Sequence, residues 1–252
     1  MSRTIATLPP GWNLHKQRGP LTAIDMRDPD VRDERVTFYV QVYRDVELAR
    51  WCLTNFRRVW PTSRLLIISD GDDDPRWPEL AREFAAEFHV GERLKLLQHG
   101  GRMLRRNLDL CLRLGPRTDY LVKFDTDTGF NRRLCWLPRV NGLFGTVQQN
   151  SHLTGIQGGF VGYSRLAAEA VHAGLDDPAL NDPHATWGRD WAVVQEFSTL
   201  GLIREDWVLA YVAQRLGIPC VDYPEVRSRW KEWVPNWDSR FAVTHPCKEM
   251  IL

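Results

Sequence analysis

The sequence of 252 residues contains no apolar run that approaches the ~18 residues a membrane-spanning helix requires. Its N-terminus also lacks the basic segment and following apolar segment that are typical of a secretory signal. These two absences predict a cytoplasmic protein without a transmembrane segment.

Cysteine pairs at metal-binding or redox spacing are missing as well. The five cysteines lie far apart in the sequence, and no two of them form a C-x-x-C motif. An odd, dispersed set that falls mostly in apolar segments indicates reduced core thiols rather than a disulfide framework. The cysteines therefore favour a reducing compartment.

The chain also has no surplus of charge, no internal repeat and no low-complexity tract. The 33 lysines and arginines nearly balance the 32 acidic residues, so no overall charge favours nucleic acid or an anionic membrane as a partner. The apolar fraction of 43% and the charged fraction of 26% are ordinary for a globular protein. A chain of this length buries a sizeable core, and without a linker we expect one domain.

Strand and helix patterns alternate along most of the chain. Residues 36–42 and 64–69 have the composition of strands, and the helix expected between them begins after Asp45 and ends at Trp60-Pro61. A strand–helix–strand unit at this spacing predicts a parallel sheet with a right-handed crossover. Further helices are expected at about 78–88, from Gly100, from Ser164 to about 173 and from Arg204, and further strands at 94–98, 120–124, 143–147, 156–163 and 218–221.

The expected strand at 120–124 ends in two acids, Asp125 and Asp127, with one residue between them. Residues i and i+2 at a strand end point the same way, so both carboxylates should face one point. In α/β sheets ligands bind at this edge, and paired carboxylates with room for phosphate oxygens suit Mg²⁺ or Mn²⁺. Taken alone, the pattern equally fits a solvated turn.

Arginines crowd the start of the helix that Gly100-Gly101 opens. Cations at a helix N-terminus oppose the helix dipole, which favours a bound anion such as phosphate at this place. The alternative is a solvated basic face. The polar residues concerned are Arg102, Arg105, Arg106 and Asn107.

Three later features also carry candidate chemistry. Gly158-Gly159 lies within an expected strand, where glycine lets a ligand approach the backbone. Glu205 and Asp206 begin a helix, although acids are common there because of the dipole. His245 lies near the C-terminus, and a single histidine is more often structural than a ligand.

Taken in order, these features resemble the GT-A class of nucleotide-sugar glycosyltransferases, in particular the inverting, family 2-like enzymes. The resemblance extends over about residues 36–248. It implies an α/β fold of the GT-A, Rossmann-like type, with a mixed, mostly parallel sheet flanked by helices in a single domain. That domain would span residues 35–252, with a nucleotide-binding half at about 35–128 and an acceptor-binding half at about 129–252. Outside the resemblance, residues 1–34 lack periodicity, are broken at Pro9-Pro10-Gly11 and Gly19-Pro20 and are expected to form an irregular, flexible N-terminal arm.

The resemblance also implies roles for residues on the donor side. Asp70 would contact the base of the donor, and the metal site would consist of the Asp-x-Asp acids and His245. Because imidazole suits Mn²⁺ better than Mg²⁺, we expect Mn²⁺ to be the preferred cofactor. The residues expected to bind the nucleotide sugar are Asp70, Arg102, Arg106, Asn107, Asp125, Gly158 and Gly159, and those expected to bind the metal are Asp125, Asp127 and His245.

On the acceptor side, Glu205 and Asp206 resemble the acid pair that begins the acceptor-binding helix. The second acid would be the general base of an inverting transfer. Trp207, Trp230 and Trp233 offer flat faces for an acceptor to stack on. The expected donor is a UDP-sugar, or else a GDP-sugar, and the acceptor is a hydroxyl group of a saccharide, a lipid-linked sugar or a modified nucleic-acid base. The loop-rich segment 174–203 has no clear counterpart in the family and is expected to form a flexible flap.

Two other functions remain open from the sequence. A nucleotidyltransferase acting on sugar phosphates also uses paired acids and a metal, but residues 41–45 lack the glycine-rich loop that usually follows its first strand. A non-catalytic carbohydrate- or nucleic-acid-binding module would fit the tryptophan-rich C-terminal part. It would leave the paired acids and His245 without a common purpose.

Overall fold

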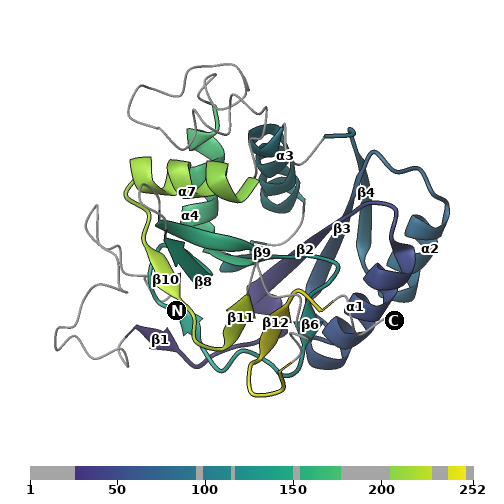
Figure 1. The fold of residues 1–252 in the computed structure, drawn as a ribbon, viewed down its shortest axis with the longest axis horizontal. Helices are drawn as coiled ribbons and strands as arrows, with labels where there is room; N and C mark the ends of the chain where they lie inside the picture. The colour runs from purple at the N-terminus through teal and green to yellow at the C-terminus, as the bar shows by residue number, and fades with distance from the viewer. Residues whose placement is uncertain are drawn as a thin grey trace.

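The structure, a computed structural model, describes residues 26–94, 99–114, 117–149, 154–176, 205–228 and 238–247. Its centre is a seven-stranded sheet with the strand order β10-β8-β9-β5-β2-β3-β4 (Figure 1). Neighbouring strands from β5 to β4 are parallel, β9 is antiparallel to both β5 and β8, and β10 is parallel to β8. The prediction of a mixed, mostly parallel α/β sheet is therefore confirmed. The strands are β2 (Val36–Val42), β3 (Arg64–Asp70), β4 (Glu87–Gly91), β5 (Tyr120–Phe124), β8 (Leu143–Gln149), β9 (Thr154–Ser164) and β10 (Cys220–Asp222).

Five α-helices among the described residues cover the two faces of this sheet (Figure 1). Alternation along the strands divides the core in two: Phe38 and Val40 face one layer, and Tyr39 faces the other. The first layer packs against α1 (Val46–Val59) and α2 (Arg76–Glu83). The second packs against α3 (Gly100–Arg113), α4 (Arg165–Gly174) and α7 (Glu205–Arg215).

Side-chain caps fix the starts of two helices where the sequence predicts them. The Asp45 carboxylate accepts a hydrogen bond from the Leu48 N–H, and the Ser164 hydroxyl accepts one from the Ala167 N–H. Each satisfies a backbone donor that the helix itself leaves unpaired. The prediction of helices beginning at these residues is confirmed.

The segment after α2 differs from the prediction. The helix expected to reach residue 88 ends at Glu83, and Ala85 then adopts a left-handed φ of 46° that a helix cannot accommodate. Residues 87–91 instead form β4, an edge strand that pairs with β3. The prediction of a strand at 94–98 is wrong at Leu94, which is not part of any strand. Residues 95–98 lie outside the described residues.

Two small sheets complete the fold. One joins β11 (Val226–Ser228), β12 (Val243–His245) and β6 (Gly129–Phe130), and the other joins β1 (Arg27–Asp28) and β7 (Leu137–Pro138). Since β12 pairs with the strand that follows the Asp-x-Asp turn, the C-terminal part of the chain is held beside the end of β5. No described helix is long and apolar enough to cross a bilayer.

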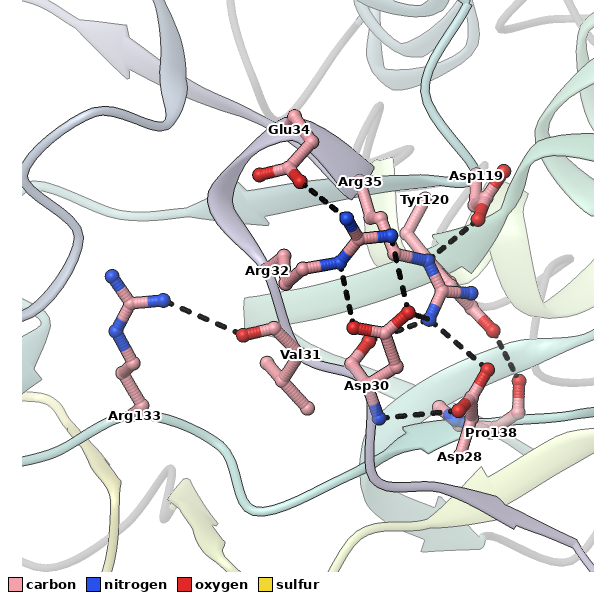
Figure 2. A network of polar contacts seen from close by, with 10 residues as sticks. All are labelled: Asp28, Asp30, Val31, Arg32, Glu34, Arg35, Asp119, Tyr120, Arg133 and Pro138. Atoms are coloured by element: carbon pink, nitrogen blue, oxygen red, sulfur yellow. Dashed lines mark hydrogen bonds and ion pairs between the residues drawn. The ribbon is translucent and has the colours of Figure 1, made fainter.

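Residues 26–35 are ordered against the sheet, although the sequence predicts an irregular lead-in up to residue 34. This part contains β1 and a 3-10 helix, Asp33–Arg35. Figure 2 shows Arg35 at the centre of a polar network, where it bonds to Asp28 at 3.0 Å and to Asp119 at 2.7 Å. Burial alone would raise the pKa of Asp28, but hydrogen bonds from the Asp30 N–H and Arg35 hold that pKa below its ordinary value.

Replacing Arg35 should destabilise the fold much more than replacing Arg32 in the same network. The Arg35 side chain is 13% exposed and Asp28 is nearly buried, so Arg35→Met leaves a carboxylate without its main counterion. We expect a loss of about 3 kcal/mol in the free energy of unfolding, the low end for a broken buried pair, because Asp119 is half-exposed.

Arg32→Met is the matched control, since its side chain is 60% exposed and its loss should leave stability nearly unchanged. Urea unfolding at pH 7 measures both variants. Because the pKa of Asp28 is lowered on folding, the difference should persist above about pH 4 and vanish as the carboxylate is protonated. Equal stabilities for the two variants would contradict the importance of the Arg35 pair.

Candidate functional site

The turn that carries the two acids is fixed by backbone hydrogen bonds from three directions. The Asp125 N–H donates to the Gly159 carbonyl at 3.1 Å, and the Thr128 N–H closes the turn on the Asp125 carbonyl at 3.0 Å. The Cys247 N–H donates to the Asp127 carbonyl at 2.7 Å. β9 and the C-terminal segment thus hold this turn in place without using its carboxylates.

The two acids and His245 form one compact group. Nε2 of His245 lies 3.1 Å from Oδ1 of Asp127 and 3.6 Å from Oδ2 of Asp125. One ligand atom from each residue lies within 4.8 Å of the others, and both Asp127 and His245 are buried. Two carboxylates and an imidazole are ligands that Mn²⁺, and other divalent ions that accept nitrogen, bind well. This donor set fits the cation that the sequence predicts.

A buried lysine lies directly behind this group. Nζ of Lys123 is 2.9 Å from Oδ1 of Asp125, 3.4 Å from Oε2 of Glu205 and 2.8 Å from the Gly158 carbonyl. Burial alone would lower the pKa of Lys123, but Asp125 and Glu205 raise it above its usual value, so the lysine stays charged. Because Oδ1 of Asp125 is bound by Lys123, the carboxylate presents Oδ2 to the cluster.

Glu205 and Asp206 have different surroundings although they are neighbours in the sequence. Glu205 is 4% exposed and ion-paired to Lys123, and burial raises its pKa. Asp206 is half-buried, and Nε2 of Gln148 lies 3.5 Å from its Oδ2. Asp206 is therefore the more exposed acid of the pair.

Gly158 and Gly159 separate Asp206 from His245. A Cβ built on Gly158 would meet the Cβ of Asp206 at 3.3 Å, and a Cβ built on Gly159 would lie 2.1 Å from the His245 ring. Successive residues in a strand face opposite ways, so the glycine pair has α7 on one side and the metal-ligand group on the other. The close approach of the His245 ring explains why position 159 requires glycine.

A second polar group lies at the ends of β2, β3 and β4. Asp70 is buried, and its carboxylate binds Arg93, Arg106 at 3.4 Å and the Leu94 N–H at 2.9 Å. The Arg93 guanidinium also stacks 3.5 Å from the centre of the Tyr43 ring. Asp70 therefore positions Arg93 and Arg106 beyond the C-terminal ends of these strands.

The other residues predicted for the site are placed as follows. The Asn107 amide donates to Oε1 of Gln41 at 3.1 Å, which ties α3 to the end of β2. Arg102 turns to Glu92 and not to Asp70. The Trp207 N–H is bonded to Oδ1 of Asp206 at 3.1 Å. Trp230, Trp233 and most of the predicted flap lie outside the described residues.

The sequence did not single out Lys123, Gln148, Tyr43 or Arg93. Lys123 had a usable signal, because a lone charge in an apolar strand two residues before Asp125 must face the same way as Asp125. The other three depend on long-range packing. Gln148 and Asp206 lie on segments far apart in the chain, and nothing in the local sequence of either indicates the other.

Adding a methyl group at Gly159 should displace His245 and weaken metal binding. The new Cβ would overlap the ring at 2.1 Å, so the imidazole must leave its present position. We expect Gly159→Ala to weaken Mn²⁺ binding by at least ~10-fold, because the loss of groups that orient a metal ligand has an effect of this size. Gly158→Ala is the control, because its Cβ points to Asp206 and should leave Mn²⁺ affinity unchanged. Titration monitored by the EPR signal of free Mn²⁺ measures both, and wild-type affinity in Gly159→Ala would contradict this placement of His245.

Comparisons with known proteins leave the family open. No family model matches the chain, and no curated protein sequence matches it. Among the similar solved structures is a chain described as a transferase mutant, which has a TM-score of 0.38 and 11% sequence identity. The match covers 67% of this chain and 87% of that one.

Proposed function

We propose that this protein is a metal-dependent glycosyltransferase of GT-A type that moves a sugar from a nucleoside-diphosphate sugar to a hydroxyl group, with inversion at the anomeric carbon. The single observation that carries the proposal is the group formed by Asp125, Asp127 and His245 at the end of β5. The proposal assigns the whole of residues 35–252 to one domain, and it favours UDP-sugars as donors.

The donor would lie across the carboxyl ends of β2, β3 and β5. Support comes from the arginines that Asp70 holds there, since guanidinium groups recognise phosphate and stack on flat rings. Tyr43, already stacked against Arg93, offers such a flat surface for a base. In this proposal Asp70 acts on the nucleotide through Arg93 and Arg106.

Asp125, Asp127 and His245 would hold a divalent cation, Mn²⁺ in preference to Mg²⁺. When bound, such a cation supplies Lewis-acid stabilisation of the diphosphate leaving group. Lys123 keeps one oxygen of Asp125 occupied, which favours coordination by the other oxygen alone. The buried charge of Lys123 also partly offsets the negative charge of the acid cluster.

Asp206 would be the general base that takes the proton from the acceptor hydroxyl. Its position at the first turn of α7 favours the ionised form, because the helix dipole stabilises a negative charge there. The amide of Gln148 would orient its Oδ2. Glu205 is too buried to reach an acceptor, and we assign it to Lys123 as a counterion.

Nucleotide release from a panel of nucleotide sugars tests the function. The purified protein is incubated with UDP-, GDP- and other nucleotide sugars, with Mn²⁺ and with EDTA, and free nucleotide is measured. We expect release from one donor class, dependent on Mn²⁺ and abolished by EDTA. Release of pyrophosphate from a nucleoside triphosphate and a sugar phosphate would instead indicate a nucleotidyltransferase. Binding of sugars or nucleic acid without any turnover would indicate a non-catalytic module.

A further inference from the structure

The side of His245 that faces away from the acid pair is bonded to a serine. The Ser228 hydroxyl lies 3.0 Å from Nδ1 of His245, and both side chains are buried. Ser228 and His245 are directly paired residues of the parallel strands β11 and β12. The contact is therefore set by the register of two strands and not by a flexible loop.

The backbone around Ser228 is itself anchored to the main sheet. The Ser228 N–H donates to Oγ1 of Thr146 at 3.1 Å, and the Thr146 hydroxyl donates to the Val226 carbonyl at 3.0 Å. On its flat face the His245 ring is pressed against Gly159. Ser228 and Gly159 together thus restrict both the tilt and the rotation of the imidazole.

The tautomer of His245 decides whether its Nε2 can bind a metal. Coordination needs the lone pair of Nε2, so the single proton of a neutral ring must then be on Nδ1. A proton on Nδ1 needs an acceptor in this buried place, and the Ser228 oxygen lies at hydrogen-bonding distance. Histidine ligands of metals commonly donate their second N–H in this way, and the partner fixes ring orientation and basicity.

We propose that Ser228 is a positioning residue that orients the His245 ring and accepts the Nδ1 proton when Nε2 binds a cation. The inference rests on the proposed cation site and names a residue of that site that binds neither metal nor substrate. A hydroxyl can donate as well as accept. When no cation is present, the hydroxyl can therefore donate to Nδ1, while an N–H at Nε2 points to Oδ1 of Asp127, 3.1 Å away. On metal binding the ring keeps one proton, which changes from Nε2 to Nδ1, and the hydroxyl turns to accept it.

The test compares Ser228→Ala with two variants. Ser228→Thr keeps the hydroxyl on a strand that tolerates β-branching, and Thr244→Val removes a neighbouring buried hydroxyl that contacts Cys247 and not His245. We expect Ser228→Ala to weaken Mn²⁺ binding by ~10–100-fold, the usual effect of losing such a partner. Ser228→Thr should restore most of the affinity, and Thr244→Val should retain it. Free Mn²⁺ is measured by EPR, and thermal unfolding checks the fold.

A second readout follows the tautomer itself. With Zn²⁺ as a diamagnetic probe, ¹⁵N NMR of the wild-type protein should show His245 protonated at Nδ1 with a proton protected from exchange, and Ser228→Ala should lose that protection. Equal Mn²⁺ affinity and equal protection in wild type and Ser228→Ala would overturn the inference. If Ser228→Ala fails to fold, Ser228→Cys, which nearly keeps the volume with a weaker acceptor, replaces it. Absence of Mn²⁺ and Zn²⁺ binding in the wild type would instead overturn the cation site itself.

Discussion

Asp206→Asn is expected to lower the rate of sugar transfer by ~10²–10⁴-fold, the usual cost of losing a general base. The amide keeps the shape of the carboxylate and its contact with Gln148, but it cannot take a proton from the acceptor. Donor binding should be unchanged, because Asp206 lies against Gly158 on the α7 side of the glycine pair, whereas His245 of the metal-ligand group lies against Gly159. Single-turnover transfer and UDP titration in the presence of Mn²⁺ measure the two effects separately.

Glu79→Gln is the matched control for this variant. Glu79 is another acid in the first turn of a helix, but it lies exposed on α2, away from the site. Its replacement tests whether losing a dipole-stabilising charge alone affects the rate. Transfer by Asp206→Asn at nearly the wild-type rate would show that another group is the base, and a product with retained configuration would exclude a single displacement.

Asp127→Asn is expected to remove metal-dependent nucleotide binding. Asp127 is buried beside His245, and an amide offers no charge to a divalent cation. The loss of Mn²⁺ affinity should exceed the ~10–100-fold expected when a residue that only hydrogen-bonds to a metal ligand is replaced, because Asp127 is itself a proposed metal ligand. Isothermal titration of UDP with and without Mn²⁺ measures it.

Asp109→Asn serves as the control for Asp127→Asn. Asp109 is an acid on α3 that pairs with Arg113, outside the site, so Mn²⁺-dependent binding should be retained. Both variants should unfold near the wild-type temperature. Mn²⁺-stimulated UDP binding that survives in Asp127→Asn would remove this carboxylate from the metal site.

Local patterns were enough to predict the elements that carry the site. Apolar, branched and aromatic composition predicted the central strands, and Asp45 and Ser164 cap their helices as expected. The Asp-x-Asp spacing predicted that Asp125 and Asp127 face a common point, and they do. These features depend on neighbours within a few residues, which is why the sequence alone contains them.

Long-range contacts explain what the sequence could not give. His245 reaches the acids because β12 pairs with β6, and its predicted place came from resemblance, not from local pattern. The sequence likewise did not separate Glu205 from Asp206. Only the packing of α7 on β9 buries the first acid against Lys123 and leaves the second accessible. The strand at 87–91 was missed because an edge strand with an exposed Val90 has little apolar pattern.

Anomalous scattering from Mn²⁺ in crystals grown with Mn²⁺ and UDP tests the proposed donor site most directly. We predict one strong peak within about 2.1–2.3 Å of ligand atoms of Asp125, Asp127 and His245, a distance between those usual for Mg²⁺ and Ca²⁺. Diphosphate oxygens should complete the coordination. Bound UDP with no peak among these three residues, or with His245 turned away from the ion, would contradict the proposed metal centre.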